Sequence, residues 1–240
     1  MRNLIKATFS NKKRIASFLG VLIFTSSFAS AQDNQLSEQE VSQGWELLFN
    51  GKDMSKWRNF KQDDLNEKWQ INDGELLLSA KGAGDILTKK TYQNFDLRLD
   101  WKISQTGNSG IFILADELGK HIYSHAPEIQ ILDNQRHSDN KLSTRLSGSL
   151  YDMIASSVDS QRVAGQWNQV RILVNNQSLK VWQNNVLTVD IEIASDAWKT
   201  LVNASKFKSW KGFGENLSGH IGLQDHGDPV AFKNLKIRTL

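Results

Sequence analysis

The sequence contains no cysteine and only two prolines among its 240 residues. Without cysteine, neither a disulfide nor a lipid-modified cysteine is available, so a hydrophobic core must stabilise the fold. Apolar runs are also short, and none after the first 31 residues approaches the roughly 20 residues that a membrane-spanning helix needs. These absences exclude a disulfide-rich scaffold and, once the N-terminal segment is removed, insertion into a membrane.

The N-terminal segment is expected to be an export signal, residues 1–31. An apolar, uncharged run from Ile15 to Phe28 precedes the small-residue pattern Ala29-Ser30-Ala31, after which we expect cleavage. Five basic residues come before or beside this run: Arg2, Lys6, Lys12, Lys13 and Arg14. A periplasmic or secreted protein is therefore predicted, with a retained N-terminal anchor as the alternative and the export route left open.

Basic charge is confined to that segment. The formal net charge is +3 for the whole chain and falls to −2 when residues 1–31, with five basic and no acidic residues, are removed. The remaining chain has no basic run of comparable density, so neither nucleic acid nor an anionic lipid surface is expected as a partner. Residues 32–43 are polar and are predicted to form a flexible lead-in to a single domain, 44–240.

Short apolar runs separated by Gly, Asn and Asp indicate an all-β domain, either a sandwich or a barrel. The clearest strand is Phe95–Ile103, which alternates apolar and charged residues without interruption. Other predicted strands are Trp45–Phe49, Trp69–Ile71, Glu75–Ser79, Gly110–Ala115, Ser149–Ile154, Trp167–Val174, Leu179–Gln183, Val186–Ile191, His220–Gln224 and Val230–Ile237. Periodicity assigns Trp101, Trp167 and Trp182 to the core.

Two turns and one helix are predicted in the second half of the chain. Asn184-Asn185 fits a two-residue hairpin turn with both residues at positive φ, and 175–177 closes the preceding hairpin, giving a three-strand meander. Between strands, 195–207 has apolar residues at helical spacing, with Ser195 as the N-cap of one or two turns.

The segment Ala126–Asp133 is predicted to be a strand with chemistry on one face. Side chains alternate along a strand, so Ile129 and Ile131 should enter the core while Glu128 and Gln130 face the other way. A carboxyl group there is a candidate general acid or base. The alternative is an ordinary solvated outer face, since polar-out alternation is common in antiparallel sheets.

Polar residues in two loops could converge on Glu128. The long loop 133–148 follows this strand and carries His137, and long loops in compact domains are often functional. His226 follows a later predicted strand, where Asp225 is placed to orient its ring. In each case the alternative is a mobile surface loop or turn.

Eight segments, in order, resemble the 3-keto-disaccharide hydrolase family of exported bacterial proteins, and together they span almost the whole chain after residue 43. They are GWELLFNGKDMSKW from Gly44, DGEL from Asp73, GDILTKKTYQNFDLRLDWKI from Gly84, GNSGIF from Gly107, PEIQILDN from Pro127, GSLYDMI from Gly148, GQWNQVRI from Gly165 and GHIGLQDHGDPVAFKNLKI from Gly219.

This resemblance implies a fold and an activity. The implied fold is a concanavalin-like jelly-roll β-sandwich of two antiparallel sheets. The implied substrates are glycosides that a separate oxidoreductase has oxidised at C3. A C3 ketone acidifies the C2 proton, so a base can remove it, the C1 alkoxide can leave, and water can add to the product. Such a route needs one base, one acid for the leaving oxygen and donors for the enolate.

We therefore expect Glu128, His226 and His137 to be catalytic. Ten further residues are expected to bind the substrate: Arg98, Asn108, Ser109, Gln130, Asp133, Tyr151, Lys206, Gln224, Asp225 and Trp210, the last as an exposed stacking platform. No metal or other cofactor is expected. A divalent cation is not excluded, because Glu128, Asp133, His137 and Asp139 could gather around one.

Two other functions remain open. An ordinary retaining glycosidase would pair Glu128 with Asp133, but their separation of five residues turns them to opposite faces unless a β-bulge intervenes. A lectin-like carbohydrate-binding module is the second alternative, because fold alone does not settle function.

Overall fold

A computed structural model describes residues 32–156 and 160–240, all of which belong to one compact unit. The predicted export signal, 1–31, lies outside the described residues. Within them are two α-helices, α1 (Glu38–Ser42) and α2 (Asp196–Ala204), and the short 3-10 turns η1 (Ile122–Ser124), η2 (Ser143–Arg145) and η3 (Lys206–Ser209). In the part that the structure describes, no helix is both long and apolar enough to cross a membrane.

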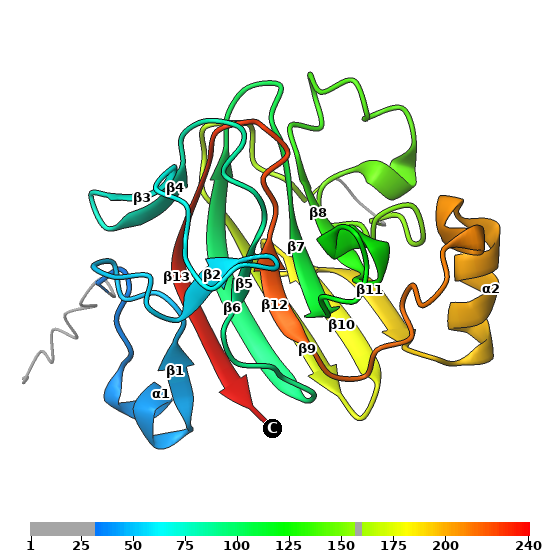
Figure 1. Cartoon of the computed structure of the whole chain (residues 1–240), viewed down its shortest axis with the longest axis horizontal. Coiled ribbons are helices and arrows are strands. Elements are labelled where there is room, and N and C mark those ends of the chain that lie inside the picture. Colours follow the sequence, from blue (N-terminus) through cyan, green and yellow to red (C-terminus); the bar gives the residue numbers. More distant parts are fainter. Residues whose placement is uncertain (1–31, 157–159) are drawn as a thin grey trace, which may run out of the picture. The chain divides into compact units, whose positions relative to one another are not determined.

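The strands form two antiparallel sheets (Figure 1). The eight-stranded sheet has the order β11-β10-β9-β6-β13-β4-β3, with β1 also paired to β13. Its strands are β1 (Trp45–Leu47), β3 (Trp69–Asn72), β4 (Glu75–Leu78), β6 (Phe95–Ile103), β9 (Asn168–Asn175), β10 (Ser178–Gln183), β11 (Val186–Glu192) and β13 (Val230–Thr239). The five-stranded sheet has the order β2-β5-β12-β7-β8, from β2 (Trp57–Asn59), β5 (Ile86–Thr88), β7 (Asn108–Ala115), β8 (Glu128–Leu132) and β12 (His220–Leu223).

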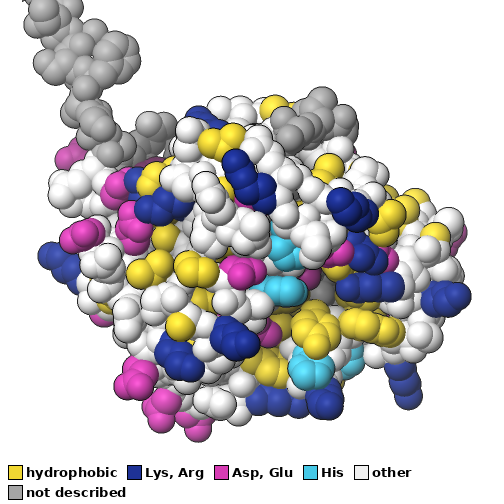
Figure 2. Space-filling view, turned by 90° about the horizontal axis from the view of Figure 1, so that it is seen from above, with side chains coloured by type: hydrophobic (Ala, Val, Ile, Leu, Met, Phe, Trp, Pro, Cys, Tyr) yellow, Lys and Arg dark blue, Asp and Glu magenta, His cyan; other side chains and the backbone are white. Residues whose placement is uncertain are grey.

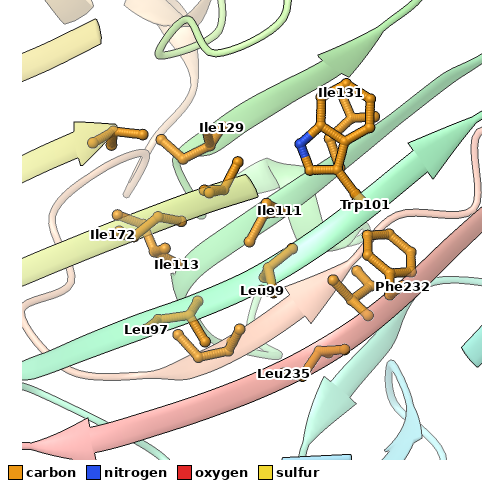
Figure 3. Close-up of a cluster of buried hydrophobic side chains, with 14 of the residues drawn as sticks. Leu97, Leu99, Trp101, Ile111, Ile113, Ile129, Ile131, Ile172, Phe232 and Leu235 are labelled. Carbon is orange, nitrogen blue, oxygen red and sulfur yellow. The ribbon is translucent and has the colours of Figure 1, made fainter. Parts of the chain in front are cut away.

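The core fills the space between the inner faces of the two sheets. Strand β6 contributes Leu97, Leu99 and Trp101, which are at most 2% exposed, while its intervening Arg98 and Lys102 point outward. Ile111 of β7 and Ile129 of β8 meet them from the other sheet, within the same cluster (Figure 3). The two-sheet, all-β fold expected from the sequence is confirmed.

Several local predictions are confirmed in detail. Strand β6 has the predicted bounds, and β9, β10 and β11 form the predicted meander. Asn184 and Asn185 both have positive φ, 49° and 68°, as the hairpin turn requires. The Ser195 side chain accepts a hydrogen bond from Trp198 N at the start of α2, which is longer than the predicted one or two turns.

Other local predictions are wrong. The segment 149–154 is a turn, in which Leu150 makes one isolated bridge to Ile129 and another to Ile154, since Asp152 at φ 57° breaks the extended backbone. Trp167 and Trp182 lie on the outer face of the eight-stranded sheet, where Lys102 and Arg171 cover their rings at 4.5 and 4.8 Å. The three-residue strands β2 and β5 were too short for an alternation pattern to reveal.

Residues 32–43, expected to be flexible, pack against the sandwich. The Ser37 and Glu40 side chains form a capping box at the start of α1. Asn34 exchanges hydrogen bonds with Asn234: its N–H donates to the Asn234 side chain at 2.7 Å, and its side-chain oxygen accepts from Asn234 N at 2.8 Å. This lead-in is therefore part of the folded unit.

Truncation in the core tests this packing. Leu99→Ala should lower the free energy of unfolding by about 2 to 5 kcal/mol, because buried methyl groups are lost and a cavity remains. Leu118 is 85% exposed, so Leu118→Ala should change it by less than about 0.5 kcal/mol. Denaturant titration of both variants measures the difference, and equal effects would contradict the assigned core.

Candidate functional site

Strand β8 lies at one edge of the five-stranded sheet and carries the site. It pairs with β7 so that Glu128 lies opposite Phe112 and Gln130 opposite Gly110. Ile129 and Ile131 enter the core, so the predicted division of faces holds. Glu128 and Gln130 are nonetheless only 9% and 1% exposed, which rules out the alternative of a solvated outer face.

A glycine on the neighbouring strand makes room for the Glu128 carboxyl group. A Cβ atom added to Gly110 would lie 2.2 Å from Glu128 Oε1, far inside van der Waals contact. The carboxyl group therefore lies directly over the backbone of β7, in space that any other residue at position 110 would fill.

Burial raises the pKa of Glu128 from its ordinary 4.5 to about 8. The positive charge of Lys206 opposes this rise, while the negative charges of Asp85 and Asp139 add to it. Because the pKa exceeds neutrality, Glu128 is mostly a neutral carboxylic acid at pH 7. A neutral carboxyl group can donate a proton, which an ordinary surface glutamate at that pH cannot do.

Three buried amide side chains surround this carboxyl group on the same face. Gln130, on β8, lies opposite Gly110, and Gln224 lies beside Gly110 on its other side. Asn108 lies two residues before Gly110 on β7. Within the described residues, Asn108 Oδ1, Gln224 Oε1 and both polar atoms of the Gln130 amide have no hydrogen-bond partner. Buried amides are nearly always paired, so these groups supply hydrogen-bonding capacity for a polar ligand.

Asp133 fixes the start of the loop that follows β8. Its side chain is fully buried, and its two oxygens accept hydrogen bonds from the backbone N–H groups of Thr106 at 2.9 Å and Gln135 at 3.1 Å. It was expected to bind substrate. These bonds instead turn it toward the loop backbone, so its geometry favours a structural role.

His137 and His226, on separate loops, meet with perpendicular rings whose centroids are 6.3 Å apart. The backbone N–H of Asp139 donates to His137 Nδ1 at 3.0 Å, so in the neutral ring the proton is on Nε2. Asp225 does not orient the His226 ring as expected. Its carboxylate accepts from the N–H groups of Ala83 at 2.7 Å and Gly227 at 2.9 Å, which fixes the loop that carries His226.

Arg145 ties three segments together beside Glu128. Its guanidinium donates to Asp139 Oδ1 at 2.8 Å and to Asp152 Oδ1 at 2.9 Å. Asp139 also accepts from the Tyr151 hydroxyl at 2.8 Å, and Asp152 from Lys206 N at 2.8 Å. These bonds raise the pKa of Arg145 and lower that of Asp139, so both carry full charge at neutral pH.

Aromatic rings border the site near Lys206. Trp210 is half-buried, with its ring centroid 5.1 Å from that of Phe207 and 6.0 Å from that of Tyr123. The predicted exposed platform is thus part of a packed aromatic cluster. Figure 2 shows histidine, acidic, basic and apolar side chains gathered near the middle of one face of the molecule.

Two predicted binding residues lie elsewhere. Arg98 is on the outer face of the eight-stranded sheet, in a separate groove of about 1010 Å³, and contacts Asp96 at 3.4 Å. Ser109 faces inward, and its hydroxyl donates to the Gln224 carbonyl at 2.9 Å. Among the residues that the structure describes, no group of three or more His, Asp or Glu side chains is arranged to hold a metal ion.

Sequence reasoning missed Asp85, whose charge acts on Glu128, and Tyr123, on which the charge of Asp85 acts in turn. Asp85 accepts a hydrogen bond from Asp225 N at 2.9 Å, and burial raises the pKa of Asp85 to about 6. Tyr123, in η1, stacks on His121 with ring centroids 4.9 Å apart. Asp85 directly precedes a strand, a position that could have been read as a candidate. Nothing in the spacing of Tyr123 distinguishes it.

The chain is similar in sequence to known proteins. A sequence profile described as a 3-keto-alpha-glucoside-1,2-lyase-like domain matches residues 44–238. A 3-keto-disaccharide hydrolase of Bacteroides thetaiotaomicron is 34% identical over 248 residues, covering 90% of this chain and 86% of that protein.

Solved structures support the same relationship. A crystal structure from Parabacteroides distasonis, provisionally described as a glycosyl hydrolase, is 31% identical with a TM-score of 0.81, covering 87% of this chain and all of that one (100%). A Bacillus subtilis protein with a galectin-like fold, 10% identical, has a TM-score of 0.52 and covers 87% of this chain and 95% of its own. The second likeness concerns the fold alone, and it agrees with the expected jelly-roll.

The raised pKa of Glu128 predicts how stability depends on pH. Between about pH 4.5 and 8 the folded chain keeps a proton that the unfolded chain loses, so stability falls as pH rises. Glu128→Gln removes this effect. Relative to the parent, the free energy of unfolding of the variant should increase by about 2 to 4 kcal/mol between pH 5 and pH 9. The difference in this free energy should change by less than roughly 1.4 kcal/mol per pH unit.

Denaturant titrations at both pH values measure this gain. Glu67 is exposed, and Glu67→Gln serves as the control for removing one formal charge. A Glu128→Gln difference that is the same at pH 5 and pH 9 would contradict the raised pKa.

Proposed function

The chain belongs to the 3-keto-disaccharide hydrolase family, and on that premise we propose that it cleaves the glycosidic bond of 3-keto-glycosides by elimination followed by hydration. The observation that carries this proposal is the buried carboxyl group of Glu128, which is mostly neutral at pH 7 and shares its sheet face with three amides that have polar atoms without a hydrogen-bond partner. The loop after its strand carries His137, whose ring meets that of His226. A C3 ketone makes the C2 proton acidic enough for an imidazole to remove.

Each group then has one role. His226 is exposed and makes no hydrogen bond through its ring within the described residues, so its imidazole is free to act as the base. Glu128 is the acid that protonates the leaving oxygen. The His137 Nε2–H donates to the C3 oxygen, and the amides of Asn108, Gln130 and Gln224 bind sugar hydroxyl groups.

The reaction balances in two stages. When His226 takes the C2 proton, the C–H electron pair forms the C2–C3 double bond and the carbonyl pair moves onto the C3 oxygen. The ketone then re-forms, the C1–O bond breaks with a new C1–C2 double bond, and the leaving oxygen takes its proton from Glu128. Water next adds: its hydroxyl bonds to C1 while the Glu128 carboxylate takes its proton, and the His226 imidazolium returns a proton to C2. This gives the free 3-keto sugar and restores both residues.

A retaining glycosidase is the second candidate, and the geometry of the site disfavours it. That mechanism needs two available carboxyl groups about 5 Å apart, one of them a nucleophile. Asp133 is fully buried and bound to backbone N–H groups. Asp139 is bound by Arg145 and Tyr151. A binding module has no need of a buried, neutral carboxylic acid, and the family membership favours an enzyme.

Two further parts of the proposal follow from the substrate and the sequence. A 3-keto-glycoside arises when an oxidoreductase removes two hydrogens from C3 of a glycoside, so the enzyme should act after such a reaction. The sequence of residues 1–31 supports export to the periplasm or beyond.

Substrate choice tests the activity. Protein comprising residues 32–240 should cleave methyl 3-keto-glucoside and leave methyl glucoside intact, because only the ketone acidifies C2. Product analysis by chromatography, with and without a chelator, measures both rates. Cleavage of both compounds would instead indicate an ordinary glycosidase, and binding without cleavage a carbohydrate-binding module.

The leaving group tests the role of Glu128. Glu128→Gln should lower kcat/KM about 10² to 10⁴-fold for a methyl 3-keto-glucoside, whose leaving oxygen needs a proton. A 4-nitrophenyl 3-keto-glucoside needs little acid assistance and should lose far less. In the parent enzyme, kcat/KM for the methyl glycoside should fall above about pH 8, as Glu128 loses its proton.

Equal losses for the two substrates would contradict the acid role and make Glu128 the base. In that case the parent rate would rise as pH passes 8.

A further inference from the structure

Lys206 is held at a fixed place beside Glu128. It is the first residue of η3, and its backbone N–H donates to Asp152 Oδ2 at 2.8 Å. The preceding Ser205 caps the turn, its hydroxyl accepting from Phe207 N at 3.1 Å. The lysine backbone is therefore fixed by two hydrogen bonds, while the side chain extends toward the site.

The ammonium group of Lys206 lies among aromatic rings. Its Nζ is 4.2 Å from the centre of the Tyr151 ring, 5.1 Å from that of Phe207 and 6.0 Å from that of Trp210. Ring faces attract a cation electrostatically, but they do not take up the hydrogen bonds that its N–H groups can donate to an oxygen or nitrogen atom. Within residues 32–156 and 160–240, Nζ makes no hydrogen bond or ion pair, so its three N–H groups remain available to a ligand.

The charges around Lys206 leave it without a dedicated counter-ion. Glu128 is mostly neutral at pH 7, and Asp139 and Asp152 are both bound by Arg145. Partial burial lowers the pKa of Lys206, while the nearby Glu128 and Asp152 raise it. The Lys206 ammonium group thus makes no direct ion pair with a described side chain, and the negative charge that Arg145 leaves unbalanced on Asp139 and Asp152 acts on it only at a distance.

The proposed reaction creates a negative charge that this cation can balance. We propose that the Lys206 ammonium group binds the C3 oxygen of the keto-glycoside and stabilises the enolate formed when the C2 proton leaves. This inference rests on the proposed function and adds a catalytic residue to it. The ligand of the ammonium group is a ketone oxygen that becomes an oxyanion during the reaction. The C3 hydroxyl of an unoxidised glycoside cannot form this enolate oxyanion.

The role is electrostatic, so Lys206 keeps its proton throughout. As the C2–H electron pair moves into the C2–C3 bond, the carbonyl pair moves onto oxygen and meets the ammonium group of Lys206. When the ketone re-forms and the C1–O bond breaks, the charge leaves with the alkoxide, which Glu128 protonates. A fixed cation next to an oxyanion acts mainly on the transition state and less on the bound ground state.

Exchange of the C2 proton tests the step directly. With methyl 3-keto-glucoside in D₂O, Lys206→Met should slow both cleavage and any C2 deuterium incorporation about 10² to 10³-fold, the range for losing one oxyanion partner. Lys206→Arg keeps the positive charge and should recover most of this loss. Lys208→Met removes a neighbouring exposed lysine of η3 and should leave both rates unchanged.

Binding separates catalysis from structure. Affinity for methyl glucoside, which cannot form an enolate, should be nearly the same in the parent and in Lys206→Met. If the parent cleaves the keto-glycoside and Lys206→Met does so at the parental rate, the inference is wrong while the proposed function stands. If the parent cleaves nothing, the proposed function itself fails.

Two other results would overturn the ammonium role. Equal loss in the Met and Arg variants, together with weaker binding of methyl glucoside, would assign Lys206 to packing. Irreversible capture of the keto-glycoside on Lys206 by borohydride would show an imine in place of an ion pair.

Discussion

The desolvation of one carboxyl group governs the chemistry that the rest of the site can do. Glu128 lies over the backbone of Gly110, and no residue with a Cβ atom at that position would leave room for it. Moving a carboxylate out of water is so unfavourable that burial raises the pKa of Glu128 to about 8. Its neutrality, in turn, means that Glu128 does not form an ion pair with Lys206 and still carries the proton that the proposed mechanism needs.

The site is built from loops, yet its charged groups are fixed. Asp133 anchors the first turn of the long loop through backbone N–H groups, and Arg145 joins that loop to the turn containing Asp152. Asp152 in turn holds the backbone of Lys206. This chain of bonds links β8 to Lys206, more than 70 residues later in the sequence. The positions of Glu128 and of the Lys206 backbone therefore depend on the same set of contacts.

The fold was largely accessible from the sequence, because alternation is a strong signal over long strands. Strand β6 was predicted in full, and the parity of β8 correctly separated Ile129 from Glu128. Over shorter strands, the periodicity was assigned to the wrong face. In β10, Leu179 and Val181 are buried, so Trp182 must face outward, where the guanidinium of Arg171 covers it.

The site was accessible only in part. Its three amides and both histidines were among the predicted residues, because each lies at or just beyond a strand with a defined face. Which residues the loops bring back to β8 depends on long-range contacts that spacing does not encode. Asp85 and Tyr123 were missed for that reason, and Arg98, on the correctly predicted polar face of β6, lies in a separate groove of the other sheet.

The unpaired amides of Asn108, Gln130 and Gln224 also bear on which sugars the site rejects. A buried amide without a partner costs about 1 to 3 kcal/mol, and a sugar hydroxyl in the right place removes that cost. A deoxy sugar of the same shape leaves the amide unpaired. The loss in its binding free energy is therefore larger than the loss of a hydrogen bond to a group that water can reach. Selectivity in such a site comes from the penalty on incomplete ligands as much as from attraction to the correct one.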